Sequence, residues 1–144
     1  MKIQFLLLVA ICTLSSSLYS QKEINEKVSF REKFEAANSL MEDNLFEFAK
    51  DIWLELVKEE PENSNINYKT GYCLLKSANN KKDAFKYLYF AKTNIDERYS
   101  PLDHSVTTSP VEVFYYLGKS FHLNYQPDSA IFYFNKFIEL SSQK

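Results

Sequence analysis

Three stretches of the chain repeat one order of side chains, and this repeat narrows the possible folds more than any other feature. Each stretch places an alanine four residues before a bulky apolar residue. The three pairs are Ala49 with Trp53, Ala84 with Leu88, and Ala130 with Phe134. Gly71 and Gly118 precede the second and third alanines by 13 and 12 residues. Because a small residue lets two helices approach and a bulky one fills the space beside it, we expect nested helix pairs repeated along the chain.

Apolar residues also recur at helical spacing. Phe30, Phe34, Ala37 and Met41 follow one another at steps of three or four residues, and a wide apolar stripe covers residues 45–57. The 144 residues include only 2 glycines, and 16% are aromatic. This composition argues against disorder and against a β-sandwich with many turns. We therefore predict a single all-α domain.

Each repeat is predicted to form a helical hairpin, with the small residue in its first helix and the alanine in its second. A lone hairpin cannot bury its apolar face, so three stacked hairpins are about the minimum for a stable fold. The predicted units span residues 30–63, 64–97 and 111–144.

An insertion separates the second unit from the third. Ala84 and Ala130 are 46 residues apart, which exceeds a repeat length of about 34 residues. The surplus lies at residues 96–110, which contain Ser, Thr and two Pro without a helical period. We predict a surface loop there. Two interpretations stay open, a tolerated insertion or a loop that contacts a partner.

The first 20 residues have the order of a secretory signal peptide. Lys2 is followed by an apolar run from Phe5 to Leu14 and then by a Ser-rich segment. The run is shorter than the roughly 20 apolar residues that span a bilayer. We predict cleavage after Ser20, a lead-in at residues 21–29, and an exported mature chain without a transmembrane span.

The sequence contains no recognisable pattern for binding a metal, a cofactor or a nucleic acid. The net charge of −2 comes without a basic stripe, so we predict no nucleic-acid partner. His104 and His122 have no second ligand at metal spacing, and no Cys pair or catalytic motif occurs. Cys73 stands among apolar neighbours in a predicted helix, which is typical of a buried, inert thiol. We predict neither metal nor cofactor and no enzymatic activity, with a thiol enzyme using Cys73 as the remaining alternative.

The repeating unit resembles the tetratricopeptide repeat. Its matching residues are Ala37 (in place of the usual Gly), Leu40, Ala49, Trp53 and Pro61 in the first unit; Gly71, Leu74, Ala84, Leu88 and Ala91 in the second; and Leu117, Gly118, Phe121, Ala130 and Phe134 in the third. Leu56 and Phe137 stand where the family usually has Ala. The resemblance implies a three-unit solenoid over nearly the whole mature chain.

A narrower resemblance concerns the insertion and the segment YYLGKSFHLNYQPDSAI after it. It is similar to the N-terminal tetratricopeptide region of envelope proteins that continue into a β-propeller-like segment and an OmpA-like peptidoglycan-binding domain. Some of these belong to the type IX secretion apparatus of Gram-negative bacteria. The resemblance implies a place in the periplasm or at the periplasmic face of the outer membrane. Peptidoglycan would be bound only through domains absent from these 144 residues.

In the tetratricopeptide family the first helices line a concave groove that binds a partner. The positions expected to face this groove are Arg31, Phe34, Asn38 and Met41; Tyr68, Tyr72, Leu75 and Lys76; and Tyr115, Lys119 and His122. Tyr and Arg are favoured in binding sites because they combine contact area with a polar group.

The predicted function is that of a non-enzymatic scaffold of the bacterial cell envelope, which binds a peptide or another envelope subunit through this groove. An alternative is an N-terminal accessory fragment of a longer OmpA-like, peptidoglycan-anchored secretion protein.

Overall fold

The computed structural model of the protein describes residues 29–142. The chain divides into two compact units, residues 1–32 and 33–144. In the first unit only residues 29–32 are described, and they are helical. The signal peptide predicted at residues 1–20 lies outside the described residues.

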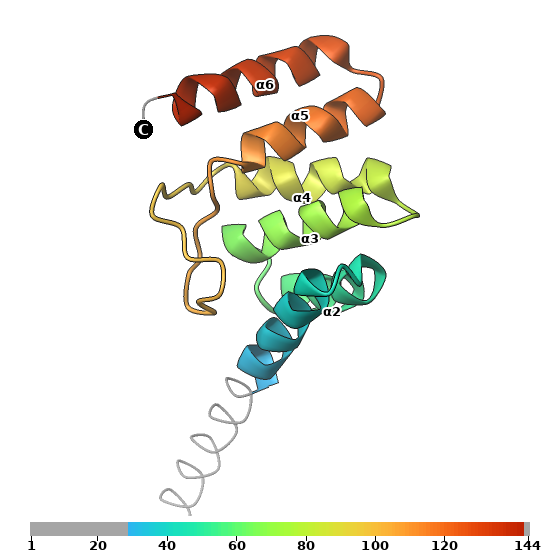
Figure 1. The fold of residues 1–144 in the computed structure, drawn as a ribbon, viewed down its shortest axis with the longest axis vertical. Helices are drawn as coiled ribbons and strands as arrows, with labels where there is room; N and C mark the ends of the chain where they lie inside the picture. Colours follow the sequence, from blue (N-terminus) through green and yellow to red (C-terminus); the bar gives the residue numbers. More distant parts are fainter. Residues whose placement is uncertain (1–28, 143–144) are drawn as a thin grey trace, which may run out of the picture. The chain divides into compact units, whose positions relative to one another are not determined.

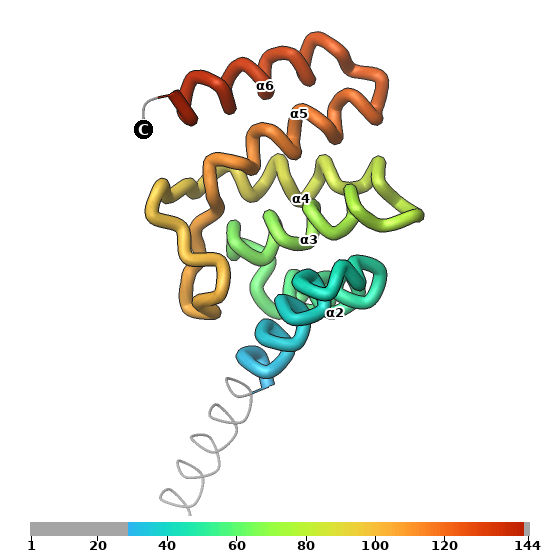
Figure 2. The backbone as a smooth tube through the Cα atoms, in the orientation of Figure 1, coloured from blue at the N-terminus to red at the C-terminus, as the bar shows by residue number. Residues whose placement is uncertain are grey.

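The second unit is built from helices that follow one another as neighbours in space (Figures 1 and 2). Its elements are a helix through residues 33–42, α2 (Phe46–Glu59), α3 (Ser64–Lys76), the short 3₁₀ turn η1 (Lys81–Asp83), α4 (Ala84–Ala91), α5 (Val113–Leu123) and α6 (Pro127–Ser141). Each helix from α2 to α6 packs against the next one, and α3 also contacts α5. The described residues form no β-strand, only one isolated bridge between Ile95 and Ser109. The predicted all-α class is confirmed.

Local sequence explains where several helices begin. The Asn63 side chain caps α3 by accepting a hydrogen bond from the Ile66 N–H at 3.2 Å. Pro127 occupies the first turn of α6, where its fixed φ suits the helix and no N–H is needed. Asn44 and Asn80 adopt φ of 60° and 62° in the links before α2 and α4. Asn tolerates this left-handed conformation better than most residues, so the chain can reverse there within a few residues.

The helices nest through the small residues marked in the sequence. A Cβ atom added to Gly71 in α3 would lie 2.5 Å from Leu88 Cγ in α4. One added to Gly118 in α5 would lie 2.7 Å from the Phe134 ring in α6. Both distances are too short for a real Cβ, so each glycine is needed for the close approach of its helix pair. The expected small-to-bulky contact is confirmed in these two pairs.

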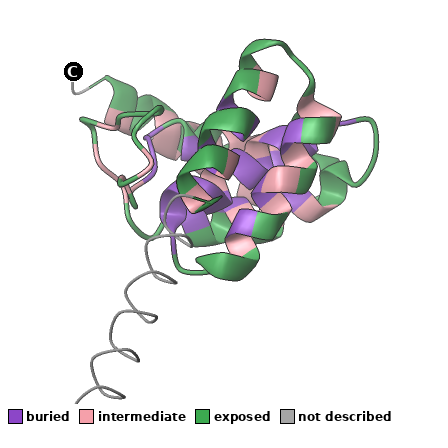
Figure 3. Cartoon of the chain, turned by 90° about the horizontal axis from the view of Figure 1, so that it is seen from below, coloured by how far each residue is buried: buried purple, intermediate pink, exposed green. Residues whose placement is uncertain are grey.

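The core lies between the packed helices, and exposed residues cover the outside of the stack (Figure 3). Its largest fully buried apolar side chains are Trp53, Phe34, Leu56, Ile66, Leu88, Leu117 and Val113. Burial of such side chains is the main source of stability in a fold of this size. No helix among the described residues is long and apolar enough to cross a membrane.

The segment between α4 and α5 is non-helical, as predicted, but it is firmly attached to the helices. It runs back beside α3 (Figure 1). The Thr107 carbonyl accepts from the Ser64 N–H at 3.0 Å, and the Val106 carbonyl accepts from Asn65 Nδ2 at 3.0 Å. The Ser109 N–H donates to the Asn94 carbonyl at 2.8 Å, and this hydrogen bond joins the two ends of the segment. The segment therefore satisfies polar groups at the start of α3.

Candidate functional site

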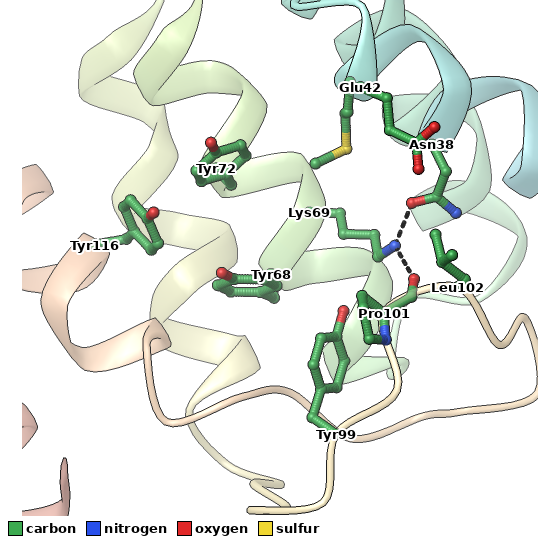
Figure 4. Close-up of a pocket in the computed structure, with 10 residues that line it drawn as sticks. Asn38, Glu42, Tyr68, Lys69, Tyr72, Tyr99, Pro101, Leu102 and Tyr116 are labelled. Carbon is green, nitrogen blue, oxygen red and sulfur yellow. Dashed lines mark hydrogen bonds between the residues drawn. The ribbon is translucent and has the colours of Figure 1, made fainter.

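A pocket of about 450 Å³ opens between the first helix of the second unit, α3, α5 and the segment before α5 (Figure 4). We call it the tyrosine pocket. It is lined by Asn38, Met41 and Glu42; Tyr68, Lys69 and Tyr72 of α3; Tyr99, Pro101 and Leu102; and Tyr116 of α5. Its volume suits one or two amino-acid side chains of a bound segment.

Four tyrosine rings form the wall shared by α3, α5 and the inter-helix segment. Tyr68 and Tyr72 are four residues apart on α3 and therefore lie on one face of the helix. The Tyr116 ring lies edge-on to Tyr72 at 4.9 Å between centroids and 6.1 Å from Tyr68. The Tyr99 ring lies edge-on to Tyr68 at 6.1 Å. The result is an aromatic surface assembled from three separate segments.

The phenols of Tyr68, Tyr99 and Tyr116 remain protonated at neutral pH. Burial raises the pKa of Tyr68 and of Tyr99 above the ordinary value. The pKa of Tyr116 is raised to about 12, mainly by burial and to a smaller extent by the electrostatic effect of the neighbouring Tyr72. The Tyr99 hydroxyl donates to Asn65 Oδ1 at 2.5 Å, which holds the segment before α5 against α3. The wall thus offers neutral hydroxyls and ring surface to a ligand.

Lys69 is an unexpected member of the site, because it is only 2% exposed whereas lysines are rarely buried. Its ammonium donates to Asn38 Oδ1 and to the Pro101 carbonyl (Figure 4). The same Nζ lies 4.6 Å from the centroid of the Phe34 ring and 5.1 Å from that of Trp53. Within the described residues it forms no salt bridge with a carboxylate. Lys69 therefore joins three segments through neutral acceptors and aromatic faces.

Burial strongly affects the protonation of Lys69 and of the thiol one turn further along α3. It lowers the pKa of Lys69 from 10.5 to about 7. It raises the pKa of Cys73 from 9.0 to about 12. A reactive cysteine needs the opposite shift and access from solvent, whereas Cys73 is fully buried. The geometry gives no support to the alternative of a thiol enzyme.

The predicted groove residues reach the pocket only in part. Asn38, Met41, Tyr68 and Tyr72 line it. Both polar atoms of Asn38 are already used, since Oδ1 accepts from Lys69 and Nδ2 donates to the Phe34 carbonyl at 3.0 Å. Asn38 therefore shapes the pocket, and both ends of its amide are held by hydrogen bonds within the protein.

Two other predicted positions are buried in the protein, and a third lies in the other unit. Phe34 is 0% exposed, because its ring packs edge-on against Trp53 at 5.2 Å. Leu75 is 9% exposed and belongs to the core. Assigning Phe34 and Leu75 to an open groove was wrong. Arg31 is exposed but belongs to the first unit, so the structure does not place it at the pocket.

The remaining predicted positions lie outside the pocket lining. Tyr115 packs against Phe134 and Phe137 of α6, at 5.9 and 5.6 Å between ring centroids. Its neighbour Tyr116 lies beside Tyr72 and lines the pocket instead, so the choice of Tyr115 as the groove-facing tyrosine of α5 was wrong by one position. Lys119, one turn beyond Tyr115, holds its Nζ 5.5 Å from that ring.

The last two positions are exposed basic residues near the C-terminal ends of their helices. Lys76 holds its Nζ 5.6 Å from the Tyr72 ring and 6.0 Å from that of Phe46. His122 is exposed in the last turn of α5. Neither lines the tyrosine pocket. Among the described residues, no group of three or more His, Cys, Asp or Glu side chains is arranged to hold a metal ion.

The pocket residues that the sequence did not predict are Glu42, Lys69, Tyr99, Pro101, Leu102 and Tyr116. One signal was available for Lys69, which stands four residues before Cys73 and so shares its face of α3. Because Cys73 was expected to be buried, Lys69 could have been expected there too. No local signal marks Tyr99, since its position depends on how the segment folds back.

Comparison with protein-family models and with curated proteins found no match to this sequence.

Lys69→Met is expected to remove a pH dependence of stability between pH 7 and 9. Folded Lys69 has a pKa of about 7, below its ordinary 10.5, so between these values the unfolded chain holds a proton that the folded chain lacks. The free energy of unfolding therefore rises with pH through this window, by up to about 1.4 kcal/mol per unit. Urea denaturation at pH 7, 8 and 9 measures this rise, which should be smaller in the variant.

Cys73 acts in the opposite direction as pH approaches 9, because its folded pKa is raised. It does so in both proteins, so the difference between them isolates Lys69. Lys86→Met, at an exposed lysine paired with Asp83, is the matched control and should keep the wild-type slope. Equal slopes in wild type and Lys69→Met would contradict a destabilising charge at this site.

Proposed function

We propose that the protein is a non-enzymatic, tetratricopeptide-like scaffold that binds a peptide segment of a partner protein in the tyrosine pocket. The observation that carries the proposal is the pocket wall of Tyr68, Tyr72, Tyr99 and Tyr116, which are brought together from α3, α5 and the segment between α4 and α5. Tyrosine is common in binding sites because its ring supplies contact area and its hydroxyl a hydrogen bond. None of these four rings is fully buried, so a ligand can reach them.

The solenoid interpretation is supported by the helix pairs themselves. Gly71 faces Leu88, and Gly118 faces Phe134, at the same stage of two successive hairpins. Ala49, Ala84 and Ala130 are all buried, with at most 2% exposure. Stacked hairpins of this kind present the side chains of their first helices along one surface, which suits an extended ligand.

The proposed location is the bacterial cell envelope, in the periplasm or at the periplasmic face of the outer membrane. It rests on the signal-peptide pattern of residues 1–20 and on the family resemblance of the sequence. An interaction scaffold in that compartment would take exported proteins as its partners.

Tyr116→Ala is expected to weaken peptide binding about tenfold or more, because truncation of a central aromatic contact typically costs about 1–2 kcal/mol or more. Peptides selected from a random dodecapeptide library on the wild-type chain serve as probes, and calorimetric titration gives their affinities. Tyr72→Ala should have a similar effect, since its ring contacts Tyr116.

Tyr125→Ala is the matched control, because Tyr125 is 83% exposed and lies outside the pocket lining. It should leave the affinities unchanged. Circular dichroism and thermal unfolding confirm that each variant folds. Folded Tyr72→Ala and Tyr116→Ala variants that bind the selected peptides with wild-type affinity would refute the pocket as the binding site.

A further inference from the structure

A second pocket, of about 330 Å³, adjoins the tyrosine pocket. Tyr68 and Tyr99 line both pockets, so a segment bound along these two rings would reach from one into the other. The rest of the second pocket comes from the two ends of the inter-helix segment, and its residues are Asp96, Glu97, Pro110, Val111 and Glu112. We call the two pockets together the double pocket.

Acidic groups dominate the charge of the double pocket. Its carboxylates are Glu42, Asp96, Glu97 and Glu112, and Lys69 is its only amine. Burial lowers the pKa of Lys69 to about 7, so this amine carries less than a full charge at neutral pH. After burial, the Glu112 carboxylate is among the charges that raise the pKa of Tyr68 and of Tyr99. Glu112 therefore acts electrostatically on both rings shared by the pockets.

The acidic side chains differ in how far they are neutralised. Asp96 Oδ1 lies 3.9 Å from Arg98 Nε and accepts from the Arg98 N–H at 2.8 Å. Glu97 and Glu112 are exposed, and no basic side chain in the described part of the chain pairs with either. Two exposed carboxylates thus line the second pocket without a basic partner among the described residues.

We infer that the double pocket binds a peptide segment that carries an apolar or aromatic side chain with a lysine or arginine within a few residues of it. This inference rests on the proposed function and specifies the partner's chemistry. The apolar side chain packs on the rings of the tyrosine pocket, where Tyr72 and Tyr116 meet. The basic side chain lies between Glu97 and Glu112, and its cation can also approach the face of Tyr68 or Tyr99.

An acidic segment paired with Lys69 is the opposite assignment, and the contacts of Lys69 argue against it. Its Nζ already donates to Asn38 Oδ1 and to the Pro101 carbonyl, and the Phe34 and Trp53 rings lie close to it. With 2% of the residue exposed, a carboxylate could reach it only by displacing these contacts. The exposed carboxylates of the second pocket would meanwhile repel the same segment.

The test uses an oriented peptide library and the purified full chain. Each peptide has a fixed Phe, and the neighbouring positions hold Arg, Gln or Glu. Peptides retained by the wild-type chain should be enriched about three- to tenfold in Arg over Gln, since an exposed ion pair is worth about 0.3–0.7 kcal/mol for each of the two carboxylates. The enrichment should shrink in 0.5 M NaCl, which screens exposed charges.

The double variant Glu97→Gln/Glu112→Gln should lose the preference for Arg while still retaining Phe-containing peptides. Asp51→Asn/Glu139→Gln is the matched control, because it removes two exposed carboxylates outside both pockets and should keep the preference. Sedimentation at several protein concentrations detects a second copy of the chain as the occupant. The inference would be overturned if the chain self-associates and if Phe peptides disrupt this association equally well with or without Arg.

The remaining outcomes separate the inference from the proposed function. Retention of Phe peptides that depends on Tyr116 but not on Arg would overturn the basic specificity and leave the scaffold function standing. Enrichment of Glu peptides would likewise overturn it, in favour of pairing with Lys69. If no library peptide is retained by the folded wild-type chain, the proposed peptide-binding function itself fails, and the inference fails with it.

Discussion

Trp53→Ala is expected to lower the free energy of unfolding by about 3–5 kcal/mol, the range typical of removing a buried aromatic side chain. Trp53 is fully buried, its ring meets Phe34 edge-on at 5.2 Å, and its Nε1 donates to Met41 Sδ at 3.2 Å. The ring also lies beside the Lys69 ammonium at 5.1 Å. Urea denaturation at neutral pH measures the loss.

The control for this variant is Phe48→Ala in the same helix, α2. Phe48 is 64% exposed, so its removal should change stability by no more than about 0.5 kcal/mol. Opening the space beside Lys69 should also admit water and move its pKa back toward 10.5. The stability of Trp53→Ala should therefore depend less on pH between 7 and 9. A loss below about 1 kcal/mol would show that Trp53 does not anchor this part of the core.

Gly71→Val is expected to destabilise the protein by about 3 kcal/mol, at the upper end of the usual cost of overpacking. Its Cβ would lie 2.5 Å from Leu88 Cγ and 3.2 Å from the Ala84 carbonyl oxygen. The backbone oxygen cannot move aside without disturbing α4. The gain from replacing a helical glycine is at most about 1 kcal/mol, which is too small to offset the clash.

A double-mutant cycle tests whether Gly71 and Leu88 fit together as a pair. Leu88→Ala alone should cost about 2–5 kcal/mol, because it leaves a cavity. Combined with Gly71→Val, the cost should fall below the sum of the single changes by about 1–3 kcal/mol, since the new side chain fills the space. Phe134→Ala faces Gly118 instead and should add to Gly71→Val without coupling. Additive losses at Gly71 and Leu88 would contradict nested packing.

The parts of the fold that could be predicted are those recorded by short spacings in the sequence. The helical class followed from apolar periodicity, and the contact of Gly71 with Leu88 followed from one small and one bulky residue at fixed positions. These features depend on neighbouring helices joined by short links, so local sequence determines them. The buried state of Cys73 was predictable for the same reason.

The candidate site could be predicted only in part, because two of its determinants are not local. Tyr115 and Tyr116 are adjacent and chemically equal, so periodicity alone could not decide which one faces α3. The position of Tyr99 depends on hydrogen bonds from Ser64 and Asn65 to a segment about 40 residues further along the chain. Phe34 was assigned to the groove because its helix face borders both the groove and the core. In the structure its side chain is buried in the core.

The attachment of the inter-helix segment changes how this stack should unfold. In a simple repeat array each hairpin touches only its neighbours, so the end units fray first and independently. Here Thr107 binds the start of α3, and the His104 ring lies 6.5 Å from that of Phe34 in the first helix of the unit. A strap that begins after the second hairpin thus reaches back to the first. We expect the first two hairpins to be lost in one cooperative step, with amide hydrogens in both exchanging through the same opening event.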